Sequence, residues 1–404
     1  MATKTKIGLL AGAVALTAGA CAALAPAEAD PRDVPVTTTT IPVGWPDTPV
    51  GDDLVDLNEI QLVGSHNSYH IAPGAPAASF LAGIASAFPE IAAGLGNPAA
   101  LNYTHASITQ QLERGIRTFE FDIYADPDGG RFTAPALASV IGWSDPFLPD
   151  NLSQPGFKVI HIADLDWRTH CATLQECLGE IRAWSDVHPG HTPIMVMLEM
   201  KGGSLPEGLP ATPILPFDTA MLDAVDAELN GAVGDRLITP DSVRGGAADL
   251  NTAITTAGWP SLAESRGKML VAMDNADLRD EYLVGHAGLV GRAMFTSSGQ
   301  GQPDGAVLKI NDPGDGSAIA SAVAQGYIVR TRADANPAPG AILDPARRDT
   351  ALGSGAQMVH TDHPVGEPAN NGYIADLGLP VQARCNPVNT TAATCSQTAV
   401  VEPN

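Results

Sequence analysis

Basic residues are scarce in this chain of 404 residues. Lys and Arg together number 22, Asp and Glu number 45, and the formal net charge is −23 at pH 7. Proteins bind nucleic acids by neutralising phosphates with Lys and Arg, and they attach electrostatically to anionic lipid headgroups through polybasic segments. The composition therefore argues against a nucleic-acid partner and against a polybasic membrane contact.

Cysteine is also rare, with 5 residues in the whole chain. Apart from Cys21 they form an even set, namely Cys171, Cys177, Cys385 and Cys395. An even set is typical of an exported protein with disulfide bonds. We favour the pairs Cys171–Cys177 and Cys385–Cys395, because each closes a short local loop. A zinc site with His170 and Cys171 is the alternative, although no second Cys/His cluster has ligand spacing.

Long apolar runs are missing except at the N-terminus. Lys4 and Lys6 precede an apolar run, and Ala27-Glu28-Ala29 then supplies the small residues of a cleavage site. We predict a secretory signal peptide over residues 1–29 and a secreted, extracellular protein. A retained membrane anchor is the weaker interpretation because the run is rich in Ala and Gly. Lipoprotein anchoring through Cys21 is a further alternative, but the expected upstream Leu is absent.

Residues 30–56 are rich in Pro, Thr and Asp without periodicity, which predicts a disordered lead-in. From Leu57 onward, short apolar runs alternate with helical stretches such as Thr173–Ser185. The runs predicted to be strands are Ile60–Val63, Thr118–Ile123, Lys158–Ile162, Ile194–Leu198, Met269–Ala272, Ala306–Ile310, Tyr327–Arg330 and Gln357–Val359. Several are apolar on successive residues, as in parallel strands buried on both faces. We therefore expect the α/β class, with a TIM-like (β/α)8 barrel over residues 57–383 and a disulfide-closed tail over residues 384–404.

Two long stretches interrupt this alternation, Tyr69–Thr104 and Asp126–Pro155. Both follow strand ends that carry polar residues, so both are expected above the barrel mouth, where loops at the carboxyl ends of strands build active sites. The second stretch contains Trp143, Phe147 and Leu148. These side chains either dip into a lipid interface or fold down as a lid.

Polar residues end four successive predicted strands, although an unpaired buried polar group costs several kcal/mol. The segments are Gly64-Ser65-His66-Asn67-Ser68, Arg117-Thr118-Phe119-Glu120-Phe121-Asp122, Val159-Ile160-His161 and Leu198-Glu199-Met200-Lys201. Because side chains alternate along a strand, Glu120 and Asp122 share one side, as do Glu199 and Lys201. Both pairs can therefore point into one mouth.

These residues indicate a metal-assisted acid/base site. Their oxygen ligands suit a hard cation, with Ca²⁺ favoured over Mg²⁺. The expected ligands are Asn67, Glu120, Asp122 and Glu199. His66 and His161 would flank the metal, and two histidines beside a metal suit phosphodiester cleavage. Taken singly, each histidine has a structural interpretation, and Glu120 or Asp122 could pair with Arg117 or Arg114.

The same segments resemble a known family. Leu62-Val63-Gly64-Ser65-His66-Asn67-Ser68-Tyr69, Gly115-Ile116-Arg117-Thr118-Phe119-Glu120-Phe121-Asp122 and Ile194-Met195-Val196-Met197-Leu198-Glu199 are similar to motifs of the calcium-dependent phosphoinositide-specific phospholipase C family, in its secreted bacterial branch. The resemblance extends from about Leu57 to about Pro364. It includes the segments Arg266–Leu270 and Gly355–Asp362.

The resemblance implies a hydrolase that cleaves phosphatidylinositol to diacylglycerol and an inositol cyclic phosphate, through attack by an inositol hydroxyl. His66 would stabilise the phosphorane, His161 would protonate the leaving oxygen, and Glu120 or Asp122 would take the hydroxyl proton. Lys201 and Arg332 are candidates for phosphate or inositol contacts. His105 and His170 are alternatives for the second histidine. The implied partner is a phospholipid at a membrane surface, with no protein partner and a monomeric enzyme.

Two other functions stay open. A glycerophosphodiester phosphodiesterase is another two-histidine, metal-dependent barrel, but that family typically has His-Arg-Gly where this chain has His66-Asn67-Ser68. A secreted calcium-dependent lectin-like or adhesin barrel would use the acidic residues for binding alone. Binding alone would not require His66 and His161 beside the carboxylates.

Overall fold

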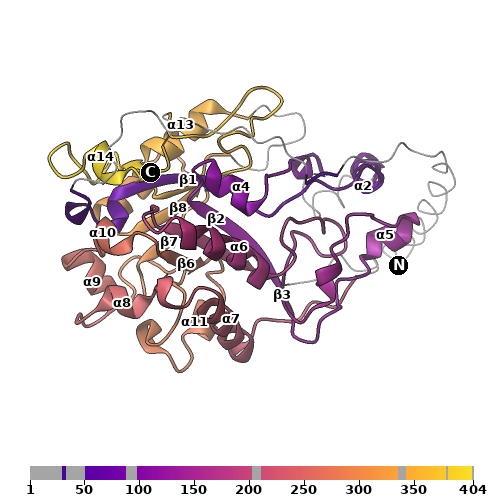
Figure 1. The fold of residues 1–404 in the computed structure, drawn as a ribbon, viewed down its shortest axis with the longest axis horizontal. Helices are drawn as coiled ribbons and strands as arrows, with labels where there is room; N and C mark the ends of the chain where they lie inside the picture. Colours follow the sequence, from indigo (N-terminus) through magenta and orange to yellow (C-terminus); the bar gives the residue numbers. More distant parts are fainter. Residues whose placement is uncertain are drawn as a thin grey trace, which may run out of the picture.

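The computed structural model describes residues 30–32, 51–87, 98–202, 211–334, 343–378 and 381–402. Its centre consists of strands that are mostly parallel and buried (Figure 1). The first sheet has the order β10-β1-β9-β8-β7 and contains β1 (Ile60–Ser65), β7 (Val307–Lys309), β8 (Ile328–Arg332), β9 (Met358–Thr361) and β10 (Arg384–Cys385). The second has the order β3-β2-β4-β6-β5 and contains β2 (Thr118–Asp126), β3 (Gly156–Val159), β4 (Ile194–Met200), β5 (Leu237–Ile238) and β6 (Met269–Met273).

The two sheets enclose one interior. Parallel bridges from Phe295 to β6 and from Ser297 to β7 join them on one side. On the other side β1 lies so close to β2 that a Cβ atom at Gly64 would be 1.8 Å from the carbonyl oxygen of Thr118. Inward side chains of both sheets meet, since Glu120 of β2 accepts a hydrogen bond from Arg330 of β8 and contacts His360 of β9. This is the wall expected of a (β/α)8 barrel.

The prediction of a parallel strand at Lys158–Ile162 is wrong. The strand found there, β3, pairs antiparallel with the far end of β2, from Ile123 to Asp126. After the long segment that follows β2, the chain returns beside the end of that strand. β3 therefore pairs with the part of β2 that extends beyond the wall, and β3 is not itself a strand of the wall. The place of an eighth parallel segment is taken by Phe295–Ser297. That segment is short and partly polar, so the apolar pattern does not reveal it.

Helices cover the outside of the wall (Figure 1). They include α4 (Ile108–Glu113), α6 (Leu174–Val187), α7 (Thr219–Ala232), α8 (Pro240–Arg244), α9 (Leu250–Thr256), α10 (Leu262–Ser265), α11 (Arg279–Tyr282), α12 (Ser317–Ala324) and α13 (Pro345–Gly353). In α6 the side chain of Thr173 caps the first turn by accepting from the backbone of Glu176, and Leu174, Leu178 and Ile181 form a buried stripe. The apolar stripe explains why the helix packs against the wall.

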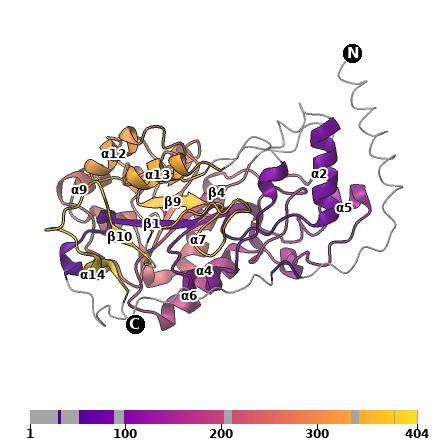
Figure 2. The same cartoon turned by 90° about the horizontal axis from the view of Figure 1, so that it is seen from above.

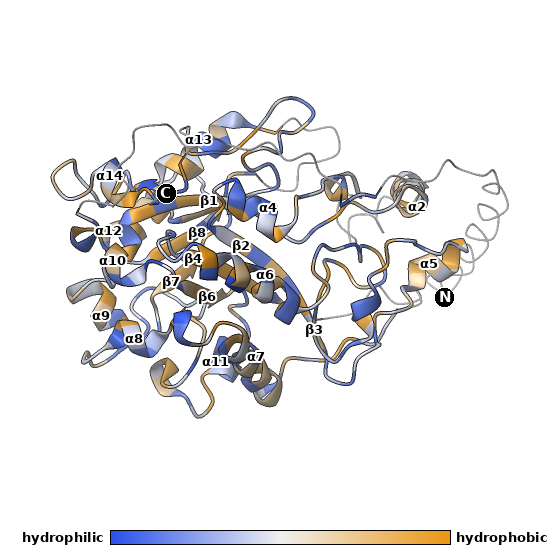
Figure 3. Ribbon diagram, viewed as in Figure 1, coloured by the Kyte–Doolittle hydropathy of each residue, from blue (hydrophilic) through white to orange (hydrophobic). Residues whose placement is uncertain are grey.

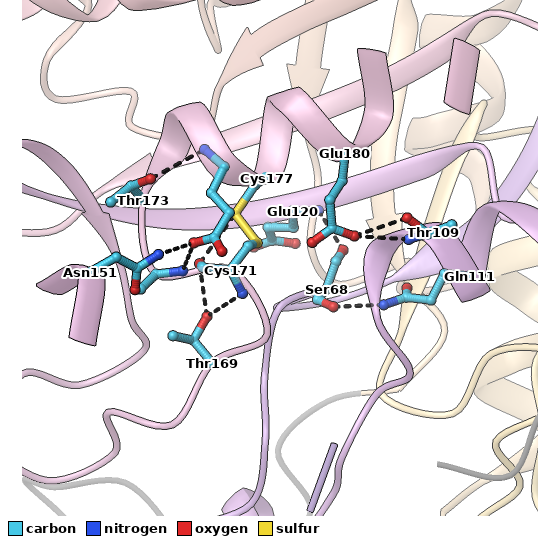
Figure 4. The surroundings of a disulfide bond; sticks show 12 residues. Ser68, Thr109, Gln111, Glu120, Asn151, Thr169, Cys171, Thr173, Cys177 and Glu180 are labelled. Atoms are coloured by element: carbon cyan, nitrogen blue, oxygen red, sulfur yellow. Dashed lines mark hydrogen bonds between the residues drawn. A yellow bond between two sulfur atoms is a disulfide. The ribbon is translucent and has the colours of Figure 1, made fainter. Parts of the chain in front are cut away.

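Both predicted disulfide bonds are present. Cys171–Cys177 closes the start of α6 (Figure 4), and Cys385–Cys395 closes a loop in the C-terminal tail. The tail pairs β10 antiparallel with β1 and continues into α14 (Gln397–Val400). Glu402 then binds Arg117 through two hydrogen bonds of 2.5 and 2.6 Å. The tail is therefore part of the folded unit.

At the opposite end of the molecule lie α2 (Ala75–Ala87) and α5 (Ala136–Ile141), from the two long stretches predicted above the mouth (Figures 1 and 2). They share a small apolar cluster that includes Leu81, Leu137 and Trp167. Trp143 and Phe147 are half-buried, and the guanidinium of Arg168 lies 5.4 and 5.1 Å from their ring centroids. The two aromatic rings are therefore folded down against the loops, and neither ranks among the exposed large hydrophobic residues that the structure describes.

The predicted signal peptide over residues 1–29, with Cys21, lies outside the described residues, as does most of the predicted lead-in. Within the described ranges, the helices are all too short or too polar to cross a membrane.

Candidate active site

The end of β1 places Asn67 in an unusual backbone conformation that serves the site. Its φ of 48° lies in the left-handed region, which Asn tolerates better than most residues. The Asn67 side chain is buried, and its Nδ2 donates to the Tyr103 hydroxyl at 3.1 Å. Its Oδ1 has no hydrogen-bond partner within the described part of the chain. A buried amide oxygen without a partner is costly unless something else binds it.

Three carboxylates from β2 and β4 converge beside it. Asp122 and Glu199 are register partners, and ligand atoms of Glu120, Asp122 and Glu199 all lie within 4.8 Å of one another. Neither oxygen of Asp122 has a hydrogen-bond partner among the described residues, although Lys201 Nζ lies 3.1 Å from Oδ2 as an ion-pair partner. The strand register therefore produces the same-side pairs expected from the sequence.

The electrostatics of this group fit a bound cation. Burial, reinforced by the charges of Glu199 and Glu120, raises the pKa of Asp122 well above its usual range, and Lys201 only partly opposes this. A hard cation would relieve this repulsion and would also bind the free oxygens of Asp122 and Asn67. The donors are all oxygen atoms, which suits Ca²⁺. The chemistry of these residues therefore fits a hard cation, and the ligand set stays a prediction.

Glu120 also belongs to a buried network behind the site. Its Oε2 accepts from the guanidinium of Arg330 and lies 2.8 Å from Nδ1 of His360. Burial alone would raise the pKa of Glu120, but Arg330 and the neighbouring histidines hold it well below its usual range. The carboxylate of Glu120 therefore stays ionised and is poorly suited to accept a proton.

His66 and His161 face the same cavity, as predicted. The cavity has a volume of about 280 Å³ and is lined by His66, Asn67, Ala100, Leu101, Tyr103, Glu120, His161, Ile162, Glu199, Asp274, Asn311, Arg330, Arg332 and Asp362. His66 Nδ1 lies 2.7 Å from Asp362, and His161 Nδ1 lies 2.8 Å from Asp166. Each histidine is thus oriented by a carboxylate on one ring nitrogen.

The surroundings of the two histidines differ. Burial and the charge of Arg332 lower the pKa of His66, although Glu120 and Asp362 oppose them. Burial alone would raise the pKa of Asp166, but the neighbouring imidazoles of His70 and His161 lower it to about 2. The side chain of His161 is 19% exposed, so its free face reaches the cavity.

The two predicted substrate contacts have different surroundings. Arg332 lines the cavity and donates to Asp362 at 3.1 Å. Lys201 binds Asp122 at 3.1 Å and Glu199 at 3.2 Å, so its charge faces the carboxylates. Arg332 is therefore the better placed of the two for a phosphate in the cavity.

The alternative histidines are held by the loops. His105 binds Glu367 through Nδ1 at 2.6 Å and the carbonyl of His66 through Nε2 at 2.9 Å. His170 Nε2 lies 2.6 Å from the carbonyl of His105. His105 therefore holds the backbone of His66 and His170 holds the backbone of His105, whereas His161 lies on the cavity wall.

Sequence reasoning missed several cavity residues. Asp362 stands two positions after His360 at the end of β9, a same-side spacing that would have pointed to it. Asp166 reaches His161 only because residues 162–166 form a tight turn with a bridge between Ile162 and Asp166. The other missed residues are Tyr103, Asp274, Asn311 and Arg330.

Comparison with known proteins gives a family match. The family model described as "Phosphoinositide phospholipase C, Ca2+-dependent" matches residues 55–387. Among curated proteins, no sequence matches. This match spans most of the chain, which is enough to assign the family.

This chain also resembles several solved structures at low sequence identity. A calcium-dependent phosphoinositol-specific phospholipase C from Pseudomonas sp. is 17% identical, with a TM-score of 0.48 over 83% of this chain and 96% of that chain. A Ca²⁺-dependent phosphatidylinositol-specific phospholipase C from Streptomyces antibioticus is 18% identical, with a TM-score of 0.48 over 76% of this chain and 95% of that chain. A variant phosphatidylinositol-specific phospholipase C from Staphylococcus aureus is 11% identical, with a TM-score of 0.40 over 79% and 91%.

Proposed function

The chain belongs to the Ca²⁺-dependent phosphoinositide phospholipase C family, and we propose that the cavity described above is where it cleaves phosphatidylinositol. The observation that carries this proposal is the arrangement of two carboxylate-backed histidines, His66 and His161, around one cavity that Asn67 lines with an unpartnered oxygen. Asp122, whose oxygens also have no hydrogen-bond partner among the described residues, lies next to the cavity residues Glu120 and Glu199. The proposed ligands of the cation are Asn67, Glu120, Asp122 and Glu199.

His66 is proposed to take the proton of the attacking inositol hydroxyl. Its Nδ1 donates to Asp362, and its Nε2 lies 3.8 Å from Oε1 of Glu120, beyond hydrogen-bond distance. The lowered pKa of His66, caused by burial and Arg332, keeps the ring neutral, so Nε2 has a lone pair for the proton. A neutral imidazole backed by a carboxylate is a suitable general base. This role goes beyond the phosphorane stabilisation that the sequence resemblance implies, and the strong ionisation of Glu120 supports it, because that carboxylate is a poor base.

His161 is proposed to give its proton to the diacylglycerol oxygen as the bond to phosphorus breaks. Asp166 fixes the orientation of the ring through Nδ1, so Nε2 is the atom that faces the cavity. The inositol hydroxyl forms the new bond to phosphorus, and the products are diacylglycerol and an inositol cyclic phosphate. Arg332 lies on the cavity wall, where its guanidinium can bind the phosphate.

When bound, Ca²⁺ supplies charge neutralisation at the phosphate and makes the attacking hydroxyl more acidic. Asp274 and Asn311 line the part of the cavity beside Arg330 and offer hydrogen-bonding groups for ring hydroxyls. Lys309 binds Asp274 at 2.5 Å and fixes its carboxylate. These groups are proposed to orient the inositol ring.

The surface around α2 is proposed to rest on the lipid surface. Residues 71–87 contain no charged residue, and neither does α5. In Figure 3 both helices appear in orange and pale shades. In a chain with a net charge of −23, these two uncharged helices avoid repulsion from anionic lipid. The rings of Trp143 and Phe147 pack on the guanidinium of Arg168 in the neighbouring loop.

We also propose that the enzyme is secreted as a monomer after cleavage behind Ala29. The two disulfide bonds support an oxidising compartment. N-terminal sequencing of protein from culture medium tests the cleavage, and light scattering tests the monomer. A lipid-modified Cys21 in the mature protein would contradict both the cleavage site and the free secretion.

Phosphorus NMR of the products tests the reaction directly. Phosphatidylinositol with Ca²⁺ should give a cyclic phosphodiester signal, and a chelator should abolish its formation. Cleavage of glycerophosphoinositol in preference to the lipid would instead favour a glycerophosphodiesterase. The absence of turnover on any inositol or glycerol phosphodiester, with Ca²⁺ binding retained, would favour a lectin-like barrel.

A further inference from the structure

A second potential metal-binding group lies behind the catalytic cavity and shares no residue with the proposed Ca²⁺ ligands. It consists of His70, His161 and Asp166, whose ligating atoms lie within 4.8 Å of one another. Asp166 Oδ2 lies 2.7 Å from Nε2 of His70 and 2.8 Å from Nδ1 of His161. His70 and Asp166 are fully buried, whereas the His161 side chain reaches the cavity.

The hydrogen bonding of His70 prepares its other nitrogen as a ligand. Nδ1 lies 3.0 Å from the backbone carbonyl of Tyr103, which can only accept a hydrogen bond, so Nδ1 carries a proton. The 2.7 Å hydrogen bond between Nε2 and Asp166 also contains a proton, and Nε2 becomes a ligand when an ion replaces that proton. Metal-binding histidines usually have this outer hydrogen bond to a carbonyl or carboxylate, which fixes tautomer and ring orientation. Stacking of the Tyr103 ring on His70, at a centroid distance of 4.2 Å, further restricts the imidazole.

Asp166 provides the second independent observation. Its Oδ1 is buried and has no hydrogen-bond partner within the described part of the chain. The carboxylate therefore has an oxygen to offer in addition to the one that already contacts both imidazoles. An unpartnered buried oxygen of this kind is expected where an ion can bind.

We propose that His70, His161 and Asp166 bind one transition-metal ion of the Zn²⁺ type, and that this ion inhibits the enzyme. Two imidazoles and a carboxylate are typical ligands of zinc, with the fourth position left for water from the cavity. Nitrogen ligands disfavour Ca²⁺, so the two sites select different ions. On binding, the ion replaces the protons that join the two imidazoles to Asp166, and these protons leave to solvent.

Inhibition follows from the atom that the ion occupies, and this part of the inference rests on the proposed role of His161. A metal on Nδ1 prevents the ring from carrying a second proton, so Nε2 keeps the one it has and no longer protonates the leaving oxygen. Added Ca²⁺ should not relieve the inhibition, because the ligand sets do not overlap.

Calorimetric titration of the Ca²⁺-saturated full chain with ZnCl2 tests the site. We expect one binding event. His161→Gln and His70→Gln should each weaken it by more than about a hundredfold, since even outer-shell partners of a metal ligand are worth roughly ten- to a hundredfold. His66→Gln is the matched control in the same cavity and should retain Zn²⁺ binding. His161 lies at the cavity wall, so its variant keeps the test valid even if replacement of the buried His70 prevents folding.

The outcomes separate this inference from the proposed function. Zn²⁺ binding that disappears with His161 and His70, and persists in Asp122→Asn, supports the metal site even if phosphatidylinositol proves not to be the substrate. Turnover of the parent should also fall with added Zn²⁺ to the same extent at low and high Ca²⁺. Absence of Zn²⁺ binding, equal binding by all three histidine variants, or loss of binding in Asp122→Asn would overturn the inference.

Discussion

Nδ1 of His66 lies 2.7 Å from Oδ1 of Asp362, although 296 positions separate the two residues in the chain. The pairing of β1 with β9 brings them together, since Ser65 is the register partner of Thr361 and each catalytic candidate follows its strand directly. The first and last strands of the wall are therefore joined by this contact at the mouth. It couples completion of the fold to assembly of the proposed general base.

Replacement of Asp362 by Asn should lower kcat by about 10²- to 10⁴-fold, the usual range for a lost acid/base function. An amide would no longer hold His66 in the required tautomer, and Arg332 would keep only Asp334 as a carboxylate partner. Steady-state kinetics on phosphatidylinositol would measure the effect. The double variant with His66→Ala should be little slower than His66→Ala alone, because the two residues act as a unit; additive losses would contradict the pairing.

Ca²⁺ should stabilise the folded protein through Asp122. The linkage relation gives about 2.7 kcal/mol when the free ion is at 100 times its dissociation constant. In Asp122→Asn this stabilisation should largely vanish. The metal-free variant should be at least as stable as the metal-free parent, because it removes a charge whose burial, reinforced by the charges of Glu199 and Glu120, raises the pKa of Asp122. Thermal unfolding with Ca²⁺ and with chelator measures both. An unchanged response of the variant to Ca²⁺ would place the ion elsewhere.

Much of the site could be predicted because it depends on strand geometry. The same-side spacing of Glu120 and Asp122 and the position of Glu199 in β4 are properties of local sequence, and the register confirms them. Asp166 could not be found in this way, because its contact with His161 depends on a turn that no pattern specified. Roles for these residues stay predictions until activity is measured.

In the fold, too, some elements could be predicted from the local sequence and others could not. Several parallel strands contain apolar runs, such as Ile194–Leu198 of β4 and Met269–Ala272 of β6, and were predicted to within a few residues. The third prediction failed because an apolar run reports burial and not direction, and Val159 pairs antiparallel with Ile123 of β2. The Phe295–Ser297 segment, which joins the wall through isolated bridges, was missed because it is short and partly polar.

Gly64→Ala should destabilise the protein by at least about 3 kcal/mol, the upper part of the usual range for overpacking. The added Cβ would lie 1.8 Å from the carbonyl oxygen of Thr118, and backbone atoms cannot move aside as a side chain can. Gly83→Ala in α2 is the matched control, since its Cβ would meet nothing within 4 Å. The control should be neutral or gain up to about 1 kcal/mol from helix propensity. Equal denaturation midpoints for the two variants would refute the proposed β1–β2 contact.

Glu402→Gln should cost about 3–5 kcal/mol at pH 7, because it leaves Arg117 buried without its charged partner. Burial alone would raise the pKa of Glu402, but Arg117 and the backbone of Thr192 lower it. A lowered folded pKa means that this stabilisation is complete above the unfolded value of about 4.3 and declines as pH falls through the folded value. The difference between parent and variant in urea unfolding should therefore shrink below about pH 4. A difference independent of pH would contradict the ionic contribution.

Two acidic charges on the outer face of α2 should weaken binding to lipid vesicles. Ala78 and Ala82 are exposed there, so Ala78→Glu with Ala82→Glu should leave folding intact. Each acidic charge near an anionic surface costs roughly 1 kcal/mol, so the pair should reduce partitioning onto phosphatidylinositol vesicles about thirtyfold. Ala318→Glu is the control, because Ala318 is exposed on α12, away from α2 (Figure 2).

Cosedimentation with vesicles measures the partitioning, and turnover of a water-soluble inositol phosphodiester tests the cavity itself. The double variant should lose activity on vesicles and retain it on the soluble substrate, because α2 contributes no residue to the cavity wall among those described. Equal vesicle binding by the double variant and the Ala318→Glu control would show that another surface meets the lipid. Loss of activity on both substrates would show that α2 supports the cavity and does not act in docking alone.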